Sequence, residues 1–290
     1  MRRRVARATL PALIFAALLI AQDNHVTLSW NKPIEPYRIA GNIYYVGTNS
    51  LASFLFVTNE GSILLNSGYE ESVPLIRASI EKLGFRFAGI KYLLSSQAHN
   101  DHSAGNFLVK ELTGARVLVM QGDDDIIANG GKGDFRWDGE ISWKPCKVDR
   151  VLHDGDTVTL GETMLNAHLT PGHTKGCTTW TTTVQEGGRK LNVIIVAGTT
   201  INPGVRLLNN PKYAAIADDY ARTWQILRSL PCDVFLGAHG SYYGMDDKLA
   251  RLKVGEKPNP FIDPQGYRES INRSERNYLD QLSKEKYATH

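Results

Sequence analysis

Residues 95–102 most limit what this chain can fold into, because they gather ligand-type side chains directly after an apolar stretch. They read Ser-Ser-Gln-Ala-His-Asn-Asp-His, so that His99, Asp101 and His102 lie within four residues. Residues 92–95 predict a strand, and a strand end that opens into a loop can aim such side chains at one point. Imidazole and carboxylate are the ligands that zinc prefers in hydrolytic sites, and buried charge without a partner is costly. The segment therefore predicts a metal site at the edge of a sheet.

Two further histidines also follow predicted strands. His173 lies in Thr-Pro-Gly-His-Thr after the strand expected at 163–169, and His239 lies in Leu-Gly-Ala-His after the strand expected at 234–236. The carboxyl ends of strands are where sites of α/β proteins usually form, so these histidines are expected to join the cluster. A lone histidine is more often a surface or packing residue. We interpret the histidines without such a setting in that way: His25, His153, His168 and His290.

Hydrophobic patterns predict strands and helices that alternate along the chain in two batches. Strands are expected at 43–46, 53–57, 62–65, 92–95, 117–120, 150–152, 157–160, 163–169, 178–184, 191–197 and 234–236. Helices are expected at 71–83, 104–112, 214–230, 248–254 and 264–286. Residues 129–143 are rich in Gly, charge and Trp without a period, and we interpret them as a surface loop. No clean linker interrupts the pattern, which favours one α/β domain over residues 22–290.

The first 21 residues are predicted to be a secretory signal peptide. Four arginines precede an apolar run at 10–21, which is shorter than the roughly 20 apolar residues that a membrane span needs. We therefore expect a periplasmic protein with no stable membrane association after cleavage; an uncleaved membrane anchor is the alternative. Removing four arginines and no acids changes the net charge from +3 to about −1, so the basicity does not indicate nucleic-acid binding.

The three cysteines are Cys146, Cys177 and Cys232, and none shows the Cys-x-x-Cys spacing of a metal or redox site. Three cysteines permit at most one disulfide and leave one thiol over, and an oxidising compartment allows such a bridge without requiring it. We interpret them as packing residues or as one structural bridge, with the pairing left open.

The motifs together resemble a family. His-x-Asp-His, Pro-Gly-His-Thr and a late strand-end histidine resemble the metallo-β-lactamase superfamily, and longer stretches resemble its subclass B3. These stretches lie at 47–50, 64–68, 171–178, 202–204 and 257–261, and the resemblance covers about residues 30–285. It implies the metallo-β-lactamase fold, an αββα sandwich of two similar halves.

The resemblance also implies two sets of zinc ligands. One set would be Asp101, His102 and His239, and the other would be position 97 with His99 and His173. The family has His at position 97, whereas this chain has Gln97, and an amide oxygen is a weaker zinc ligand than imidazole. We therefore expect one or two zinc ions, held more tightly by the first set; the alternative is that Gln97 still binds and both sites fill.

Two polar residues are expected to assist these ligands and the substrate. Asn66 stands where the family often has Asp, and it is expected to support the metal ligands from behind. A hydroxyl of Thr199 or Thr200 is expected to bind the substrate carboxylate, although a simple turn hydroxyl is the equal alternative.

The resemblance implies a secreted β-lactamase that acts on small-molecule penicillins, cephalosporins and carbapenems. The sequence gives no signal of oligomeric state, and a monomer is expected by default. Zinc would make hydroxide available at neutral pH for attack on the lactam carbonyl, and Asp101 would orient it as the catalytic residue.

Two alternatives remain. The first is another hydrolase of this fold, such as a thioesterase or a lactonase; these families usually carry a bridging Asp after the strand at 191–197, where this chain has Gly-Thr-Thr at 198–200. The second is a non-catalytic zinc-binding relative, which would bind zinc without turning over any β-lactam.

Overall fold

Two β-sheets form the centre of the molecule. The computed structural model describes residues 29–288, so the predicted signal peptide at 1–21 lies outside the described residues. The first sheet has the order β1-β2-β3-β4-β5-β6-β7 and the second β12-β11-β10-β9-β8. The first comprises β1 (Tyr37–Ala40), β2 (Ile43–Tyr45), β3 (Phe54–Thr58), β4 (Gly61–Leu65), β5 (Ile90–Leu94), β6 (Arg116–Met120) and β7 (Arg150–Leu152). The second comprises β8 (Thr157–Leu160), β9 (Thr163–Leu169), β10 (Thr178–Glu186), β11 (Arg189–Val196) and β12 (Val234–Gly237).

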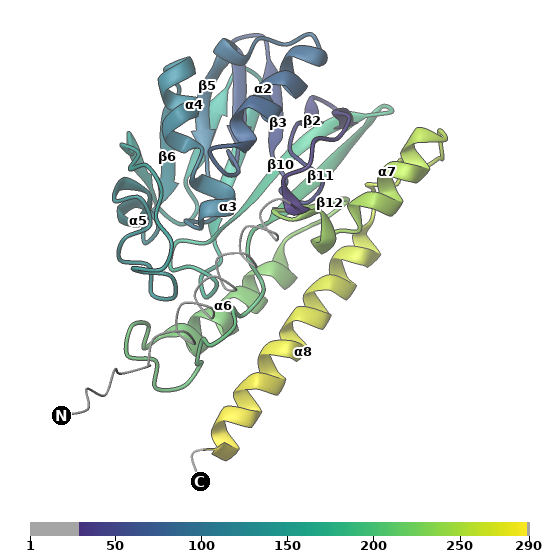
Figure 1. Cartoon of the computed structure of the whole chain (residues 1–290). Helices are drawn as coiled ribbons and strands as arrows, with labels where there is room; N and C mark the ends of the chain where they lie inside the picture. The colour runs from purple at the N-terminus through teal and green to yellow at the C-terminus, as the bar shows by residue number, and fades with distance from the viewer. Residues whose placement is uncertain (1–28, 289–290) are drawn as a thin grey trace, which may run out of the picture.

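The first sheet is apolar on both faces because both faces are covered. Along β3, Phe54 and Phe56 belong to the core between the sheets, whereas Leu55 belongs to a second core on the outer face. Successive side chains of a strand point to opposite faces, so this run builds both cores at once. The outer core is closed by the helices α2 (Ser72–Lys82) and α4 (Asn106–Thr113), as Figure 1 shows.

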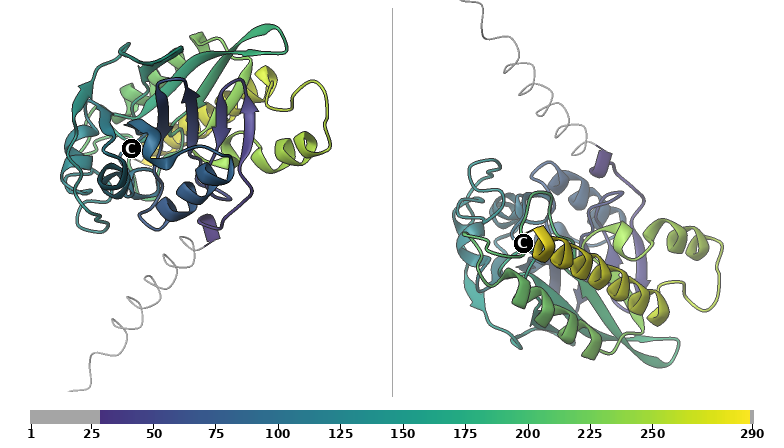
Figure 2. Two further views of the ribbon diagram at one scale, coloured as in Figure 1. Left: turned by 90° about the horizontal axis from the view of Figure 1, so that it is seen from above. Right: turned by 90° about the horizontal axis from the view of Figure 1, so that it is seen from below.

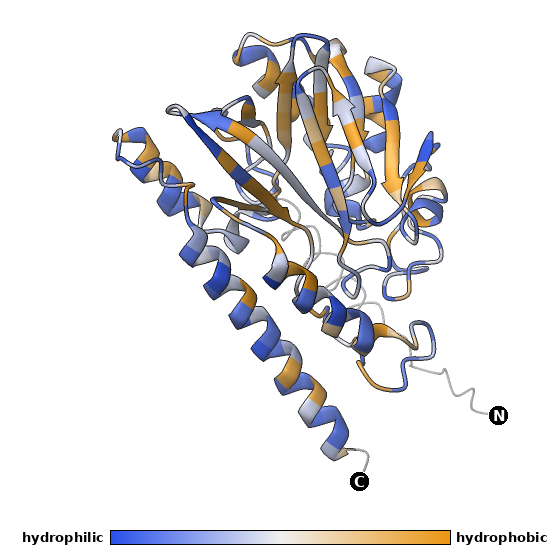
Figure 3. Cartoon of the chain, turned by 180° about the vertical axis from the view of Figure 1, so that it is seen from behind, coloured by the Kyte–Doolittle hydropathy of each residue, from blue (hydrophilic) through white to orange (hydrophobic). Residues whose placement is uncertain are grey.

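The second sheet is covered on its outer side by α6 (Ile216–Ser229) and the long α8 (Pro264–Ala288), which pack on each other (Figure 2). Trp224 of α6 and Ile271 of α8 are buried in the same core as the strands. The strands carry most of the apolar colour in Figure 3, and α8 is largely hydrophilic where it faces solvent. The layers are therefore helix, sheet, sheet and helix, which confirms the expected αββα sandwich.

Most expected elements are present, with small differences at their ends. The helix expected at 104–112 begins at Asn106, with Gly105 as its N-cap residue. Gly105 packs closely on the backbone of Ser67 and Tyr69, where a Cβ would lie 2.8–2.9 Å from their carbonyl oxygens. The sequence reasoning missed β1 and the short helices α3 (Asn100–Ser103) and α5 (Asp124–Ala128).

Other features complete the described chain. The short helix α7 (Met245–Lys253) connects the end of the second sheet to α8.

The three cysteines were expected to be packing residues or to form one bridge. In the structure all three are free thiols, so no bridge forms among them. Among residues 29–288, no helix is both long and apolar enough to cross a membrane.

The parallel strands bring the chemistry to one edge of the sandwich. β5 runs parallel to β4 and β6, and β12 runs parallel to β11. The segments that follow β5, β9 and β12 carry the histidines and the acid predicted from the sequence, and the segment that follows β11 carries Thr199 and Thr200. Because these segments leave the sheets at neighbouring strand ends, side chains from residues 95 to 239 meet there.

Candidate metal centre

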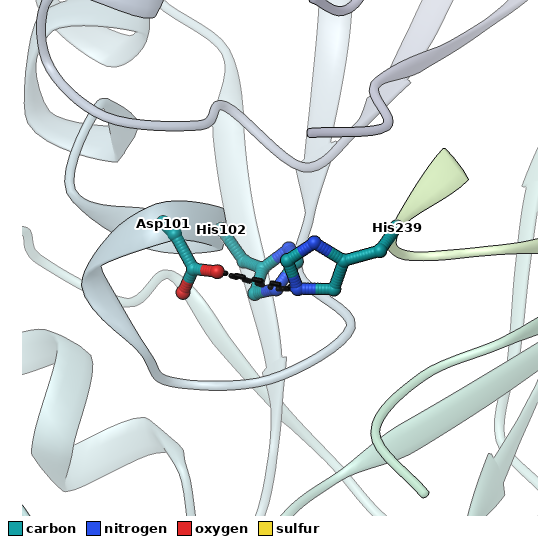
Figure 4. Close-up of side chains that lie close together, drawn as sticks. All are labelled: Asp101, His102 and His239. Carbon is teal, nitrogen blue, oxygen red and sulfur yellow. Dashed lines mark hydrogen bonds and ion pairs between the residues drawn. The ribbon is translucent and has the colours of Figure 1, made fainter. Parts of the chain in front are cut away.

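Asp101, His102 and His239 converge on one point. The Nε2 atoms of the two histidines lie 3.1 Å apart, and Asp101 Oδ2 lies 3.3 Å from each of them. Figure 4 shows the carboxylate and the two rings directed toward one another from α3 and from the end of β12. Three lone-pair donors gathered so closely match the donor set that zinc binds.

Backbone hydrogen bonds fix the loops that carry these ligands. The His102 carbonyl accepts from Ser67 N at 3.0 Å, which ties α3 to the end of β4. On the other side, Ala238 N donates to Val196 O at 2.9 Å and so continues the pairing of β12 with β11 up to His239. The ligands therefore project from segments that the sheets already hold in place.

The electrostatics of the site favour the protonation states that a metal requires. Burial raises the pKa of Asp101, but the neighbouring His102 and His239 outweigh burial and bring it well below its ordinary value. Burial lowers the pKa of His102, and burial together with the nearby His99 lowers the pKa of His173 to about 3. The acid is therefore ionised and these two imidazoles are neutral near pH 7, as metal ligation demands.

The second predicted set also comes together. The His99 and His173 rings are 4.8 Å apart between centroids, and His173 Nδ1 donates to Thr200 O at 2.6 Å, which leaves Nε2 of that ring for a metal. Gln97 is only 1% exposed, yet neither its Oε1 nor its Nε2 has a hydrogen-bond partner. Because a buried amide without partners is costly, this orphaned side chain fits a site that is completed by a cation.

Asp123 holds the two ligand loops together, and the sequence reasoning missed it. Its Oδ2 accepts from Ala98 N at 2.8 Å and from Thr174 Oγ1 at 2.7 Å, and its Oδ1 accepts from Gly176 N at 2.7 Å. Burial raises the pKa of Asp123 to about 6, against the lowering effect of these hydrogen bonds. No periodicity marks such a residue, since it acts on loops that are distant in sequence.

Asn66 supports the ligand loop from behind, as the sequence predicted. Its Oδ1 accepts from Ser96 N at 2.8 Å, and its Nδ2 donates to Ala52 O at 3.3 Å. Asn66 adopts a φ of 65°, a left-handed conformation that Asn tolerates better than most residues. An Asp at this position could make the first bond but not the second.

The ligand sets open into a cleft of about 810 Å³. Asp101, His99, His173 and His239 all line it, together with aromatic and polar side chains from other loops. A cleft of this size with a few convergent polar groups is typical of small-molecule sites.

Comparisons with known proteins agree with this geometry. Residues 46–185 match the family described as the metallo-beta-lactamase superfamily. The structure of the FEZ-1 metallo-β-lactamase from Legionella gormanii is 45% identical, with a TM-score of 0.87, over 88% of this chain and 98% of that one. BJP-1, a subclass B3 metallo-β-lactamase of Bradyrhizobium japonicum, is 38% identical, with a TM-score of 0.83, over 90% of this chain and 98% of that one. The chain belongs to the metallo-β-lactamase superfamily.

Curated relatives in the superfamily are more distant. A probable metallo-hydrolase of Burkholderia pseudomallei is 31% identical over 39% of this chain. A hydroxyacylglutathione hydrolase of Rhodospirillum rubrum is 28% identical over 35% of this chain. The matched region spans only 37% and 31% of the lengths of these two proteins.

The loop after β11 places the adjacent residues Thr199 and Thr200 in different surroundings. A Cβ on Gly198 would lie 2.3 Å from His173 Cδ2, so the His173 ring fills the space that any side chain at 198 would need. The Thr199 hydroxyl lies 3.3 Å from Ser274 Oγ on α8, whereas Thr200 lines the cleft. Of the two candidates, Thr200 is therefore the one placed to meet a ligand in the cleft.

Residues 129–143 are a loop, as expected, but the expectation of a surface loop is wrong for part of them. Gly130, Gly131 and Asp134 are buried, and Trp137 lines the cleft. The polar composition hid this role, because the buried acid is satisfied by hydrogen bonds within the loop.

Trp30 and Tyr242 also line the cleft and were missed. The Trp30 ring lies edge-on to His239 at 5.6 Å between centroids, and the Tyr242 ring lies 5.1 Å from His239. Tyr242 stands three residues after a predicted ligand, a weak signal that could have found it. Trp30 had no such signal, because it precedes the first strand.

Proposed function

We propose that this chain is a zinc-dependent β-lactamase of subclass B3 that hydrolyses the lactam amide of penicillins, cephalosporins and carbapenems. One observation carries the proposal: five ligand-type side chains converge on one cleft in a chain that is 45% identical to FEZ-1 over 98% of that protein. Fold alone would not support a substrate, since related folds host several reactions.

The residues present fit zinc. Asp101, His102 and His239 would hold one ion tightly, because the set has two imidazoles and a carboxylate already gathered. His99 and His173 with the weaker ligand Gln97 would hold a second ion less tightly, so the zinc content would lie between one and two. Zinc bound there would supply an activated water at neutral pH.

The chain's own groups would bind and orient the reactants. The Asp101 carboxylate lines the cleft and can accept a hydrogen bond from the attacking water, which directs a lone pair toward the lactam carbonyl. The Thr200 hydroxyl lines the same cleft and can donate to the carboxylate that β-lactams carry. The rings of Trp30 and Trp137 offer apolar surface that excludes water from the bound substrate.

Export to the periplasm is part of the proposal. The arginines and the apolar run of residues 1–21 support it. The net charge of about −1 after cleavage gives no sign of nucleic-acid binding.

A thioesterase is the second candidate, because the hydroxyacylglutathione hydrolases match part of the chain. The segment at 198–200 weighs against it, since it reads Gly-Thr-Thr and offers no acidic side chain after β11, where those families usually carry one.

The test is turnover of a penicillin, a cephalosporin, a carbapenem and a glutathione thioester by the purified chain, with metal content measured on the same sample. We expect chelator-sensitive hydrolysis of the β-lactams, a large loss in Asp101→Asn and none in Asp138→Asn, an exposed acid outside the ligand sets. Thioester turnover alone would replace the proposal with the second candidate. Bound zinc without any turnover would indicate a non-catalytic relative.

A further inference from the structure

The loop at 129–143 contains one buried titratable side chain, Asp134, which is 4% exposed. Its two oxygens have different surroundings. Oδ1 accepts from the backbone N–H groups of Arg136 at 2.8 Å and Trp137 at 2.6 Å. Oδ2 lies 3.6 Å from His99 Nε2, just beyond hydrogen-bond distance.

The His99 ring has no other partner at this nitrogen. Nε2 of His99 is buried and makes no hydrogen bond, so the Asp134 carboxylate is the acceptor that faces it. A proton on Nε2 would lie between the ring and this carboxylate, which leaves Nδ1 with its lone pair for a metal. A carboxylate that accepts from a ligating imidazole fixes its tautomer and makes it a stronger ligand.

This support matters more here than in a site with three imidazoles. Gln97 contributes a neutral amide to the set, so His99 and His173 must supply most of its affinity. His173 is oriented by a neutral backbone carbonyl, Thr200 O, whereas His99 faces a carboxylate.

The same carboxylate also shapes the cleft. The backbone turn that Oδ1 holds places Trp137 at the cleft wall, where the Arg136 guanidinium lies 3.8 Å from the centre of its ring. Arg136 Nε in turn donates to Pro203 O at 2.9 Å, in the segment that follows β11. One side chain thus connects a ligand ring to the loop that borders the substrate space.

We propose that Asp134 is a positioning residue that holds His99 in its Nε2–H tautomer and so makes the Gln97, His99 and His173 set competent for metal. This inference depends on the part of the proposed function that assigns a metal to the site, and it does not depend on the identity of the substrate.

The first test needs no metal, and its deciding measurement is made on the wild type. Long-range ¹H–¹⁵N spectra of the metal-free full chain report which ring nitrogen of each histidine carries the proton. We expect the Nε2–H form at His99 in the wild type and its loss or mixing in Asp134→Asn, where an amide N–H₂ group can face the ring. A wild-type His99 in the Nδ1–H form would overturn the proposal, even in a chain that hydrolyses no β-lactam.

The second test measures affinity. His239→Ala removes a ligand of the other set, so Co²⁺ titrated into that variant reports on the set that contains His99. In this background we expect Asp134→Asn to weaken Co²⁺ binding about 10- to 100-fold. Asp138→Asn serves as the matched control, because Asp138 lies exposed on the same loop and accepts from Gly133 N. Equal Co²⁺ affinity in the Asp134 and Asp138 variants would contradict the positioning role.

Discussion

At the scale of single residues, Gln97 is the side chain whose chemistry departs most from the pattern around it. Gln97 is as buried as a core residue, but neither its amide oxygen nor its amide nitrogen has a hydrogen-bond partner. The fold therefore buries a polar side chain without satisfying its hydrogen bonds. A weak ligand is a coherent explanation of this arrangement, since the cost of burial would be repaid only when a cation is present.

Replacing this residue tests that explanation. Gln97→His should raise the zinc content measured after dialysis against limiting zinc from near one ion toward two, because imidazole binds zinc more strongly than an amide oxygen. Metal analysis of both proteins, prepared side by side, provides the measurement. If the variant held no more zinc than the wild type, Gln97 would not be what limits the second ion.

Steric contact with the His173 ring requires glycine at position 198. A Cβ at this position would lie 2.3–2.7 Å from three atoms of His173, so Gly198→Ala must displace the ring. We expect a loss of about 1–3 kcal/mol in the free energy of unfolding and weaker metal binding by the set that contains His173. Gly89→Ala is the control, since its nearest contact would be an ordinary 3.7 Å. Urea unfolding and metal titration of the two variants decide the matter; equal behaviour would refute the steric argument.

At the scale of elements, the strands were predictable and the loops between them were not. The apolar runs in β3 and β11 reflect local burial, which a sequence records directly. The strand-end positions of His99, His173 and His239 predicted that these side chains would meet. Asp123 and Asp134 act between segments far apart in the chain, and only the tertiary structure brings their partners to them.

The raised pKa of Asp123, which connects two loops, predicts how the stability of the protein depends on pH. Its pKa is raised to about 6 from 3.8, so the folded protein binds this proton more tightly than the unfolded chain does. The stability that this proton contributes is present in full below about pH 4 and is lost as pH rises through about 6. In the metal-free protein, the free energy of unfolding of the wild type relative to Asp123→Asn should therefore fall by about 2.4 kcal/mol between pH 4 and pH 7.

Urea unfolding across this pH range checks the slope. The difference between the two proteins cancels the titration of the other groups, since both chains share them. A difference that rose with pH would show that the three hydrogen bonds outweigh burial and lower the pKa of Asp123. A constant difference would show that they balance burial, and either result would contradict the raised pKa.

At the scale of the whole molecule, the site joins the two halves of the sandwich. Asp101 and His102 follow a strand of the first sheet, whereas His239 and His173 follow strands of the second. Each ligand set therefore takes residues from both sheets, and a metal in either set would connect them. The sequence could predict the two halves and their ligands, but not how closely the sheets would bring them together.

Metal removal should accordingly lower global stability. A ligand that binds only the folded state at about 100 times its Kd adds about 2.7 kcal/mol to the free energy of unfolding. For a domain of this size that corresponds to a rise in Tm of roughly 5–11 °C, which a chelator should abolish in calorimetry. His239→Ala should remove most of this rise and Gln97→Ala little of it, because the set with Asp101 is the tighter one. The reverse order would mean that the orphaned amide, and not the gathered carboxylate, marks the stronger site.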